Sequence, residues 1–129
     1  MKFKFVPHTA DIKFLAYGKT LKKVFKNSAI AMKKSMTKNK IKSKAEKEIN
    51  VKGKDLEELL YNFLEELLVL FDSENFIFSK IKNLEINEEK KEIKAKLSGD
   101  DKNNYKFLTD IKAITYSEMF VKKEKNKWV

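Results

Sequence analysis

The sequence lacks cysteine, and it contains a single histidine and a single proline. Without cysteine the chain cannot form disulfides, bind zinc through thiolates or use a cysteine nucleophile. One histidine excludes metal sites built from several imidazoles, and no Gly-rich phosphate loop or nucleophile elbow is present. No apolar run reaches the ~18 residues of a transmembrane helix, and no signal-peptide core follows Met1. We therefore expect a cytoplasmic protein without membrane association.

Arginine is also absent, so all 29 basic residues are lysines. The net charge is +10, and residues 1–52 carry most of the positive excess. Such a charge suits RNA or a protein–RNA assembly, but arginine is the residue that makes bidentate contacts to phosphate and guanine. A lysine-rich, arginine-free composition is also typical of biased genomes and of some thermophiles. Both interpretations stay open at the level of composition.

A chain of 129 residues and 15.2 kDa fits one domain, residues 1–129, with one hydrophobic core. Hydrophobic periodicity and turn residues predict the following elements: strands at 3–6 and 11–17, a helix from 20 to about 36, a polar connection at 37–47, a strand at 48–52, a helix from 55 to about 71, a strand ending at 86, a turn at 87–90, a strand at 92–97, a polar loop at 98–104 and a strand region at 111–122. This order predicts an α+β two-layer sandwich, in which two helices pack on one face of a mostly antiparallel sheet.

Capping residues mark the start of both predicted helices. Thr20 is a typical N-cap, although Lys22 and Lys23 follow in the first turn, where positive charge opposes the helix dipole. Asp55 is the second N-cap, and Glu58 three residues later makes a variant of the capping box. The leucine-rich face of this second helix is the strongest apolar pattern in the chain, and we expect it at the centre of the core.

Acid–base machinery finds little support in the sequence. The pairs Glu57/Glu58 and Glu65/Glu66 are spaced to lie on the solvent side of the second helix. No base, nucleophile and orienting group can be assembled from the remaining residues, so we expect a protein that is not an enzyme.

One compact run, His8-Thr9-Ala10-Asp11-Ile12, carries possible chemistry. Asp11 begins a predicted strand after a turn, where a carboxylate can join backbone carbonyls around a hard cation. An aspartate at such a place also accepts turn hydrogen bonds, and a lone histidine commonly has a structural role. Spacing alone leaves these alternatives open, with the structural one favoured.

Three blocks of sequence resemble the archease family, in the family's order and across nearly the whole chain. They are His8-Thr9-Ala10-Asp11-Ile12 with Tyr17-Gly18 and Thr20-Leu21, the segment from Asp55 to Leu68, and Lys112-Ala113-Ile114-Thr115-Tyr116 followed by Met119. The resemblance implies a non-catalytic accessory protein that activates the RNA ligase of tRNA splicing by promoting its guanylylation and multiple turnover. GTP is then used by the ligase and not by this chain.

The resemblance also implies a metal site and a partner surface. Asp11 takes the place of one family metal ligand, for Ca²⁺ or for Mg²⁺ or Mn²⁺, and we expect the family's last strand, with its second ligating aspartate, to be absent beyond Val129. Asp110 lies outside the matching position. His8, Lys112 and Thr115 become candidates for the ligase-contacting or active surface, and for Lys112 an outward position on an ordinary strand is equally consistent.

Two other classes of function compete with the ligase activator. A lysine-rich RNA-binding module would act without a ligase and lose RNA affinity steeply with salt. A chaperone-like interaction module would protect unrelated clients without requiring Asp11. For the activator, contact with RNA through the basic N-terminal half is expected to be weak or indirect.

Overall fold

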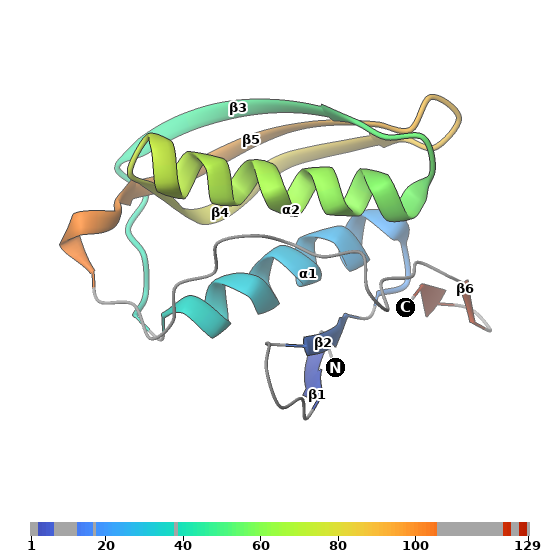
Figure 1. Ribbon diagram of the computed structural model, residues 1–129, viewed down its shortest axis with the longest axis horizontal. Helices are drawn as coiled ribbons and strands as arrows, with labels where there is room; N and C mark the ends of the chain where they lie inside the picture. Colours follow the sequence, from blue (N-terminus) through green and yellow to red (C-terminus); the bar gives the residue numbers. More distant parts are fainter. Residues whose placement is uncertain are drawn as a thin grey trace.

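A computed structural model describes residues 3–6, 13–16, 18–37, 39–105, 123–124 and 127–128. Figure 1 shows a sheet with two helices on one side of it and a separate β-hairpin beside the first helix. The elements are β1 (Phe3–Val6), β2 (Lys13–Ala16), α1 (Leu21–Met36), β3 (Ala45–Lys52), α2 (Leu56–Ser73), β4 (Phe76–Asn87), β5 (Glu92–Asp101), the 3₁₀ helix η1 (Lys102–Asn104), β6 (Lys123–Glu124) and β7 (Lys127–Trp128).

The main sheet has the strand order β3-β5-β4, and both pairings are antiparallel. Helix α2 contacts all three strands, and α1 contacts α2 and β4. Both helices therefore cover the same face of the sheet, as Figure 1 shows. The predicted α+β sandwich with two helices on one face of an antiparallel sheet is confirmed.

The core lies between the helices and the inner face of the sheet. Phe25 of α1 and Phe63 of α2 are fully buried, and their rings stack with centroids 6.1 Å apart. From the central strand, Ile93 and Leu97 point into the same core and are fully buried. Because side chains on a strand alternate between faces, β5 places Lys94 and Lys96 on the outer face of the sheet. The apolar faces of both helices and the inward-facing residues of the sheet thus form one hydrophobic cluster.

Both predicted N-caps are confirmed. The Thr20 hydroxyl accepts a hydrogen bond from the Lys23 N–H at 3.2 Å, and the Asp55 carboxylate accepts one from the Glu58 N–H at 2.7 Å. The Glu58 side chain returns to the Lys54 N–H at 3.0 Å, one residue before the cap itself. These bonds satisfy amide groups that a helix leaves unpaired at its first turn.

Strand β4 is irregular. Its register against β5 shifts between Phe78 and Lys80 and again between Ile81 and Asn83, which places a bulge at Ser79. Opposite the first bulge, β5 carries Gly99, where an added Cβ would come within 2.1 Å of the Ile77 carbonyl oxygen. The close approach of the two backbones therefore requires glycine at this position.

Two predicted boundaries are wrong. The connection expected at 37–47 ends earlier, because β3 begins at Ala45, which pairs with Gly99. The polar loop expected at 98–104 is instead the end of β5 followed by η1. Polar residues occupy the strand end because neighbouring groups satisfy their side chains there. In particular, Ser98 and Asp100 are both buried and hydrogen-bonded.

The predicted strands at the N-terminus are confirmed over Phe3–Val6 and Lys13–Ala16, and residues 11, 12 and 17 of the second predicted strand lie outside the described residues. The strand region predicted at 111–122 lies outside the described residues. Among the helices that the structure does describe, none is long and apolar enough to cross a membrane.

Candidate functional site

The residues that the sequence singles out all lie outside the described residues. His8, Asp11, Lys112 and Thr115 are among them, so their proximity to one another stays a prediction. In the part of the chain that the structure describes, no group of three or more histidine or acidic residues is arranged to hold a metal ion. The described residues thus supply no metal site of their own, and the fit of a cation to Asp11 depends on residues 7–12.

The structure does fix the two ends of the segment that carries His8 and Asp11. Strands β1 and β2 are antiparallel, and Val6 pairs with Lys13. The chain therefore enters and leaves residues 7–12 at adjacent positions of one hairpin.

A polar cluster around the buried Asp100 lies at the end of β5, where the chain continues through η1 toward residue 106. The Tyr105 hydroxyl donates to Asp100 Oδ2 at 2.8 Å and accepts from the Lys42 N–H at 3.0 Å. The other Asp100 oxygen accepts from the Asp101 N–H at 2.8 Å and from the Asn104 side chain at 3.3 Å. The chain that continues to Lys112 consequently starts from a fixed point next to the loop before β3.

These contacts shift the ionisation of both partners. The hydrogen bond from Tyr105 is the main reason that the pKa of Asp100 lies below its ordinary value, and the Asp101 N–H and Asn104 act in the same direction. The Lys42 N–H lowers the pKa of Tyr105, but burial and the bond to Asp100 outweigh it, so that the net shift is upward. The pair is held as carboxylate and neutral phenol, which is a structural clamp and no proton donor at neutral pH.

Three serines form a second cluster beside this clamp. The Ser43 hydroxyl lies 2.6 Å from the Ser79 hydroxyl and 3.1 Å from that of Ser98. Ser79 also donates to the Ser98 carbonyl at 3.0 Å. Because these hydroxyls bond to one another and to backbone, they fasten the loop before β3 to the bulge of β4 and to β5. None of the hydrogen bonds described for these serines involves a general base that could activate a nucleophile.

Lys33 of α1 reaches the same bulge. Its ammonium donates to the Ser79 carbonyl at 2.9 Å and lies 4.7 Å from the centroid of the Phe78 ring. Burial, together with the nearby charge of Lys34, lowers the pKa of Lys33 to about 8. The bulge turns a carbonyl out of the strand ladder, and Lys33 satisfies it. Sequence reasoning missed both clusters, because the polar segment 98–104 looked like a loop rather than a buried strand end.

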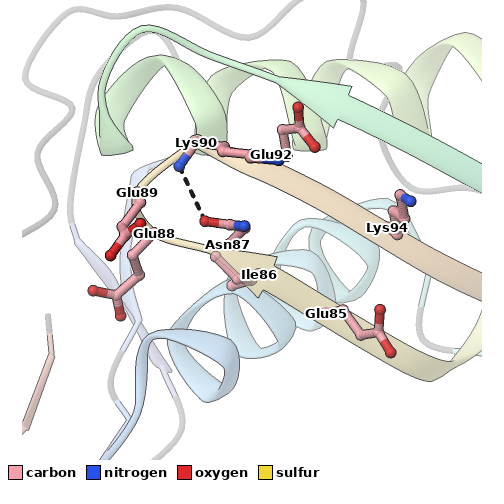
Figure 2. Close-up of a pocket in the computed structure, with 8 residues that line it drawn as sticks. All are labelled: Glu85, Ile86, Asn87, Glu88, Glu89, Lys90, Glu92 and Lys94. Atoms are coloured by element: carbon pink, nitrogen blue, oxygen red, sulfur yellow. Dashed lines mark hydrogen bonds between the residues drawn. The ribbon is translucent and has the colours of Figure 1, made fainter.

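A surface hollow of about 730 Å³ lies at the β4–β5 hairpin. Figure 2 shows that its lining comes from both strands and the turn, with the carboxylates of Glu85, Glu88 and Glu89 directed outward. The Asn87 side chain accepts from the Lys90 N–H at 3.0 Å, which closes the turn (Figure 2). The hollow is open to solvent and is lined by both acidic and basic side chains, so it does not enclose a small ligand.

The two helices carry opposite charge. Helix α1 contains five lysines and no acidic residue, and α2 contains five acidic residues and no lysine. On the sheet, by contrast, lysines and glutamates pair across strands, as in Lys52–Glu92 at 3.4 Å and Lys96–Glu48 at 3.7 Å. The helical layer therefore combines a basic helix with a neighbouring acidic helix, whereas the outer face of the sheet carries mixed charge.

Comparison with known proteins agrees with this fold along the whole chain. Residues 3–129 match the model of the family described as "Archease protein family (MTH1598/TM1083)". The chain is 42% identical over 132 residues to the protein archease of Methanosarcina acetivorans, with 98% of this chain and 90% of the relative covered. It is 40% identical over 131 residues to the protein archease of Sulfurisphaera tokodaii, with 99% and 94% covered.

A solved structure is similar as well. The solution structure of Methanobacterium thermoautotrophicum protein 1598 superposes with a TM-score of 0.84 at 32% identity, covering 98% of this chain and 93% of that one. The resemblance that three sequence blocks indicated is thereby confirmed by sequence and by fold. This chain belongs to the archease family.

Proposed function

We propose that this protein is a non-catalytic activator of the RNA ligase that joins tRNA halves in splicing. The observation that carries the proposal is the family match over residues 3–129, which includes all three blocks that resemble the archease family. The activator promotes guanylylation of the ligase and its multiple turnover, and the ligase is the protein that consumes GTP. Both proteins work in the cytoplasm.

Activation of this kind requires the protein to bind one state of the ligase better than another. A helper can shift the equilibrium of its partner only by its difference in affinity for the two states. His8, Lys112 and Thr115 belong to the surface that contacts the ligase. Support for this grouping comes from the resemblance to the archease family, in which the first block contains His8 and the third block contains Lys112 and Thr115.

Asp11 holds a divalent cation, Ca²⁺ or else Mg²⁺ or Mn²⁺, at this surface. Hard cations need several oxygen ligands, so one carboxylate must be joined by carbonyl oxygens or water, and the affinity is expected to be weak. Calorimetric titration of each cation into the wild type and into Asp11→Ala measures this directly. Asp72→Ala, which removes an exposed carboxylate of α2, is the matched control. Equal binding by all three proteins would remove Asp11 from the site.

The decisive experiment measures guanylylation and multiple-turnover RNA ligation by the ligase of the same organism. The wild type, Asp11→Ala and Asp72→Ala are each added to the ligase. We expect stimulation by the wild type and by Asp72→Ala, and a loss of stimulation with Asp11→Ala. No stimulation by the wild type would contradict the proposal and would favour an RNA-binding or chaperone-like function.

A further inference from the structure

The most uneven feature of the described surface is the distribution of lysine. Between Asp11 and Glu46 the sequence contains no acidic residue at all. The lysines of this region that lie on α1 and on the loop after it form what we call the lysine strip: Lys22, Lys23, Lys26, Lys34, Lys40, Lys42 and Lys44. All of them are exposed except Lys26, which is half-buried.

The strip begins on α1. Lys22 and Lys26 lie one turn apart, a separation of about 5–6 Å, and Lys34 follows two turns after Lys26. The stretch from Lys22 to Lys34 extends roughly 18 Å along the helix axis. Beyond the helix, Ile41 is buried, while Lys40 and Lys42 on either side of it point to solvent. Figure 1 shows this loop rising from the end of α1 toward β3.

Among the described residues no lysine of the strip forms an ion pair, although the charge of Lys44 helps to lower the pKa of Asp100. The ion pairs found among residues 18–37 and 39–105 use Lys47, Lys52, Lys82 and Lys96, all from the sheet. A general lysine bias of the sequence would place lysine on both helices. Helix α2 instead has five acidic residues and no lysine, whereas α1 has five lysines and no acidic residue. Compositional bias alone therefore does not account for the segregation of charge.

The placement also opposes local stability. Lys22 and Lys23 lie in the first turn of α1, where no acidic residue is present and where positive charge opposes the helix dipole. Acidic residues occupy the same turn of α2, as Glu57 and Glu58 do. The unfavourable interaction with the helix dipole occurs in α1 but not in α2. We infer that the lysines of α1 serve a function of its surface rather than the stability of the helix.

We propose that the lysine strip binds the phosphate backbone of RNA, without reading its sequence. Several exposed ammonium groups along one helix and the loop after it can each contact a phosphate of a polymer that carries one negative charge per nucleotide. The strip has no arginine for bidentate contacts to bases, so recognition stops at the phosphates. The inference rests on the proposed function for its setting, since the RNA is then the substrate held by the partner ligase.

A protein partner suits this surface less well. Protein interfaces depend on a few buried aromatic or aliphatic anchors, and the one large exposed apolar side chain among the described residues is Val69, on α2. On the strip, the apolar position between Lys26 and Lys34 is Ile30, which is half-buried. The acidic residues of α2 would repel RNA, so we expect the phosphates to follow α1 and the loop after it rather than α2.

The test measures binding of a labelled single-stranded 20-nucleotide RNA to the isolated protein by fluorescence anisotropy over a range of salt. The variant Lys22→Glu/Lys23→Glu/Lys26→Glu reverses part of the strip, and two of its substitutions favour the helix dipole, so α1 is retained. The matched control, Lys80→Glu/Lys90→Glu/Lys94→Glu, changes the net charge equally on exposed positions of β4, the hairpin turn and β5.

We expect the strip variant to bind RNA at least about tenfold more weakly and to lower the salt slope by about 2, and the control to change affinity by less than about threefold. Absence of RNA binding by the wild type at low salt, or an equal loss in the control, would overturn the inference.

Guanylylation of the ligase in the absence of RNA provides the second readout, and the strip variant is expected to stimulate it like the wild type. If the variant loses this stimulation while its RNA binding is unchanged, the strip is a protein-docking surface and the inference is wrong. If the wild type itself stimulates no guanylylation, the proposed function is wrong. The anisotropy measurement then still decides whether the lysine strip binds RNA.

Discussion

Tyr105 donates a hydrogen bond to Asp100 Oδ2 across 2.8 Å, and its hydroxyl oxygen accepts the Lys42 N–H. One side chain thereby joins the end of β5, the turn after it and the loop before β3. Lys102 adds to this junction, because its N–H donates to the Asn75 carbonyl at 2.8 Å and its ammonium lies 4.5 Å from the centre of the Phe71 ring. The end of β5, the segment after it, the loop before β3 and the turn between α2 and β4 are thus held together at one end of the sheet.

The clamp predicts the effect of Tyr105→Phe. The substitution leaves an oxygen of buried Asp100 and the Lys42 N–H without their partner, and unsatisfied buried polar groups destabilise a fold. We expect the midpoint of thermal unfolding to fall by several degrees, measured by circular dichroism. Tyr61→Phe is the control: it removes a hydroxyl that bonds to Glu65 on α2, where neither residue is buried and water can replace the lost partner, so the midpoint should change little. An unchanged midpoint for Tyr105→Phe would show that the clamp is dispensable.

Asp100 also predicts a loss of stability in acid. Its pKa in the folded protein lies below the ordinary value of 3.8, chiefly because Tyr105 donates to it. A carboxyl group with a depressed folded pKa stabilises the fold above its unfolded pKa, and this contribution is lost as the pH falls through the folded value. In urea unfolding at pH 6 and pH 3, the wild type should therefore lose more stability than Asp100→Asn. Equal losses would contradict the assignment.

Lys33 predicts a change at the opposite end of the pH scale. Burial lowers its pKa from 10.5 to about 8, so between these values the unfolded chain binds more protons than the folded one. Stability contributed at this site therefore rises as the pH increases from 8 to 10.5. The unfolding free energy of the wild type relative to Lys33→Met should be larger at pH 10 than at pH 7.5.

The control for Lys33 is Lys40→Met, which removes an exposed positive charge from the loop after α1. Its stability difference from the wild type should vary less between the two pH values. A pH-independent difference for Lys33→Met would show that the ammonium is fully solvated in the folded protein.

Gly99 predicts a steric limit in the sheet. An alanine Cβ would lie 2.1 Å from the Ile77 carbonyl oxygen, and the neighbouring atom is backbone that cannot rotate away. Gly99→Ala should therefore lower the unfolding free energy by about 3 kcal/mol, the upper part of the usual range for overpacking. Lys94→Ala on the exposed face of the same strand is the control. A loss below about 0.5 kcal/mol in Gly99→Ala would mean that β4 can move away from β5.

The first turn of α1 predicts a stabilising substitution. Lys22→Glu or Lys23→Glu replaces a charge that opposes the helix dipole with one that favours it, for a gain of about 0.3–1 kcal/mol at low salt. Lys34→Glu, in the last turn, should destabilise the protein by a similar amount because the dipole is reversed there. Chemical denaturation at low and high salt measures both, and the two effects should shrink together with added salt.

The elements with strong local signals followed from the sequence. Thr20 and Asp55 begin their helices because a side-chain oxygen three residues before an unpaired amide is itself a local arrangement. The leucine stripe of α2 and the alternation of β5 up to Leu97 likewise need no knowledge of distant residues. The positive charge of the first half of the chain could also be predicted, because it is a property of the composition. The archease resemblance came from short blocks in the right order.

The tertiary structure decided where polar residues are buried and which charges meet. Ser98 lies in β5 because Ser43 and Ser79 reach it from other parts of the chain, and Asp100 is held by Tyr105, whose hydroxyl is fixed in turn by the distant Lys42 N–H. No local pattern contains Ser43, Ser79 or Lys42. The bulge at Ser79 and the lowered pKa of Lys33 depend on the packing of α1 against β4. Hydrophobic periodicity reports the face that a residue occupies, whereas hydrogen bonds between distant segments exist only once the layers have packed.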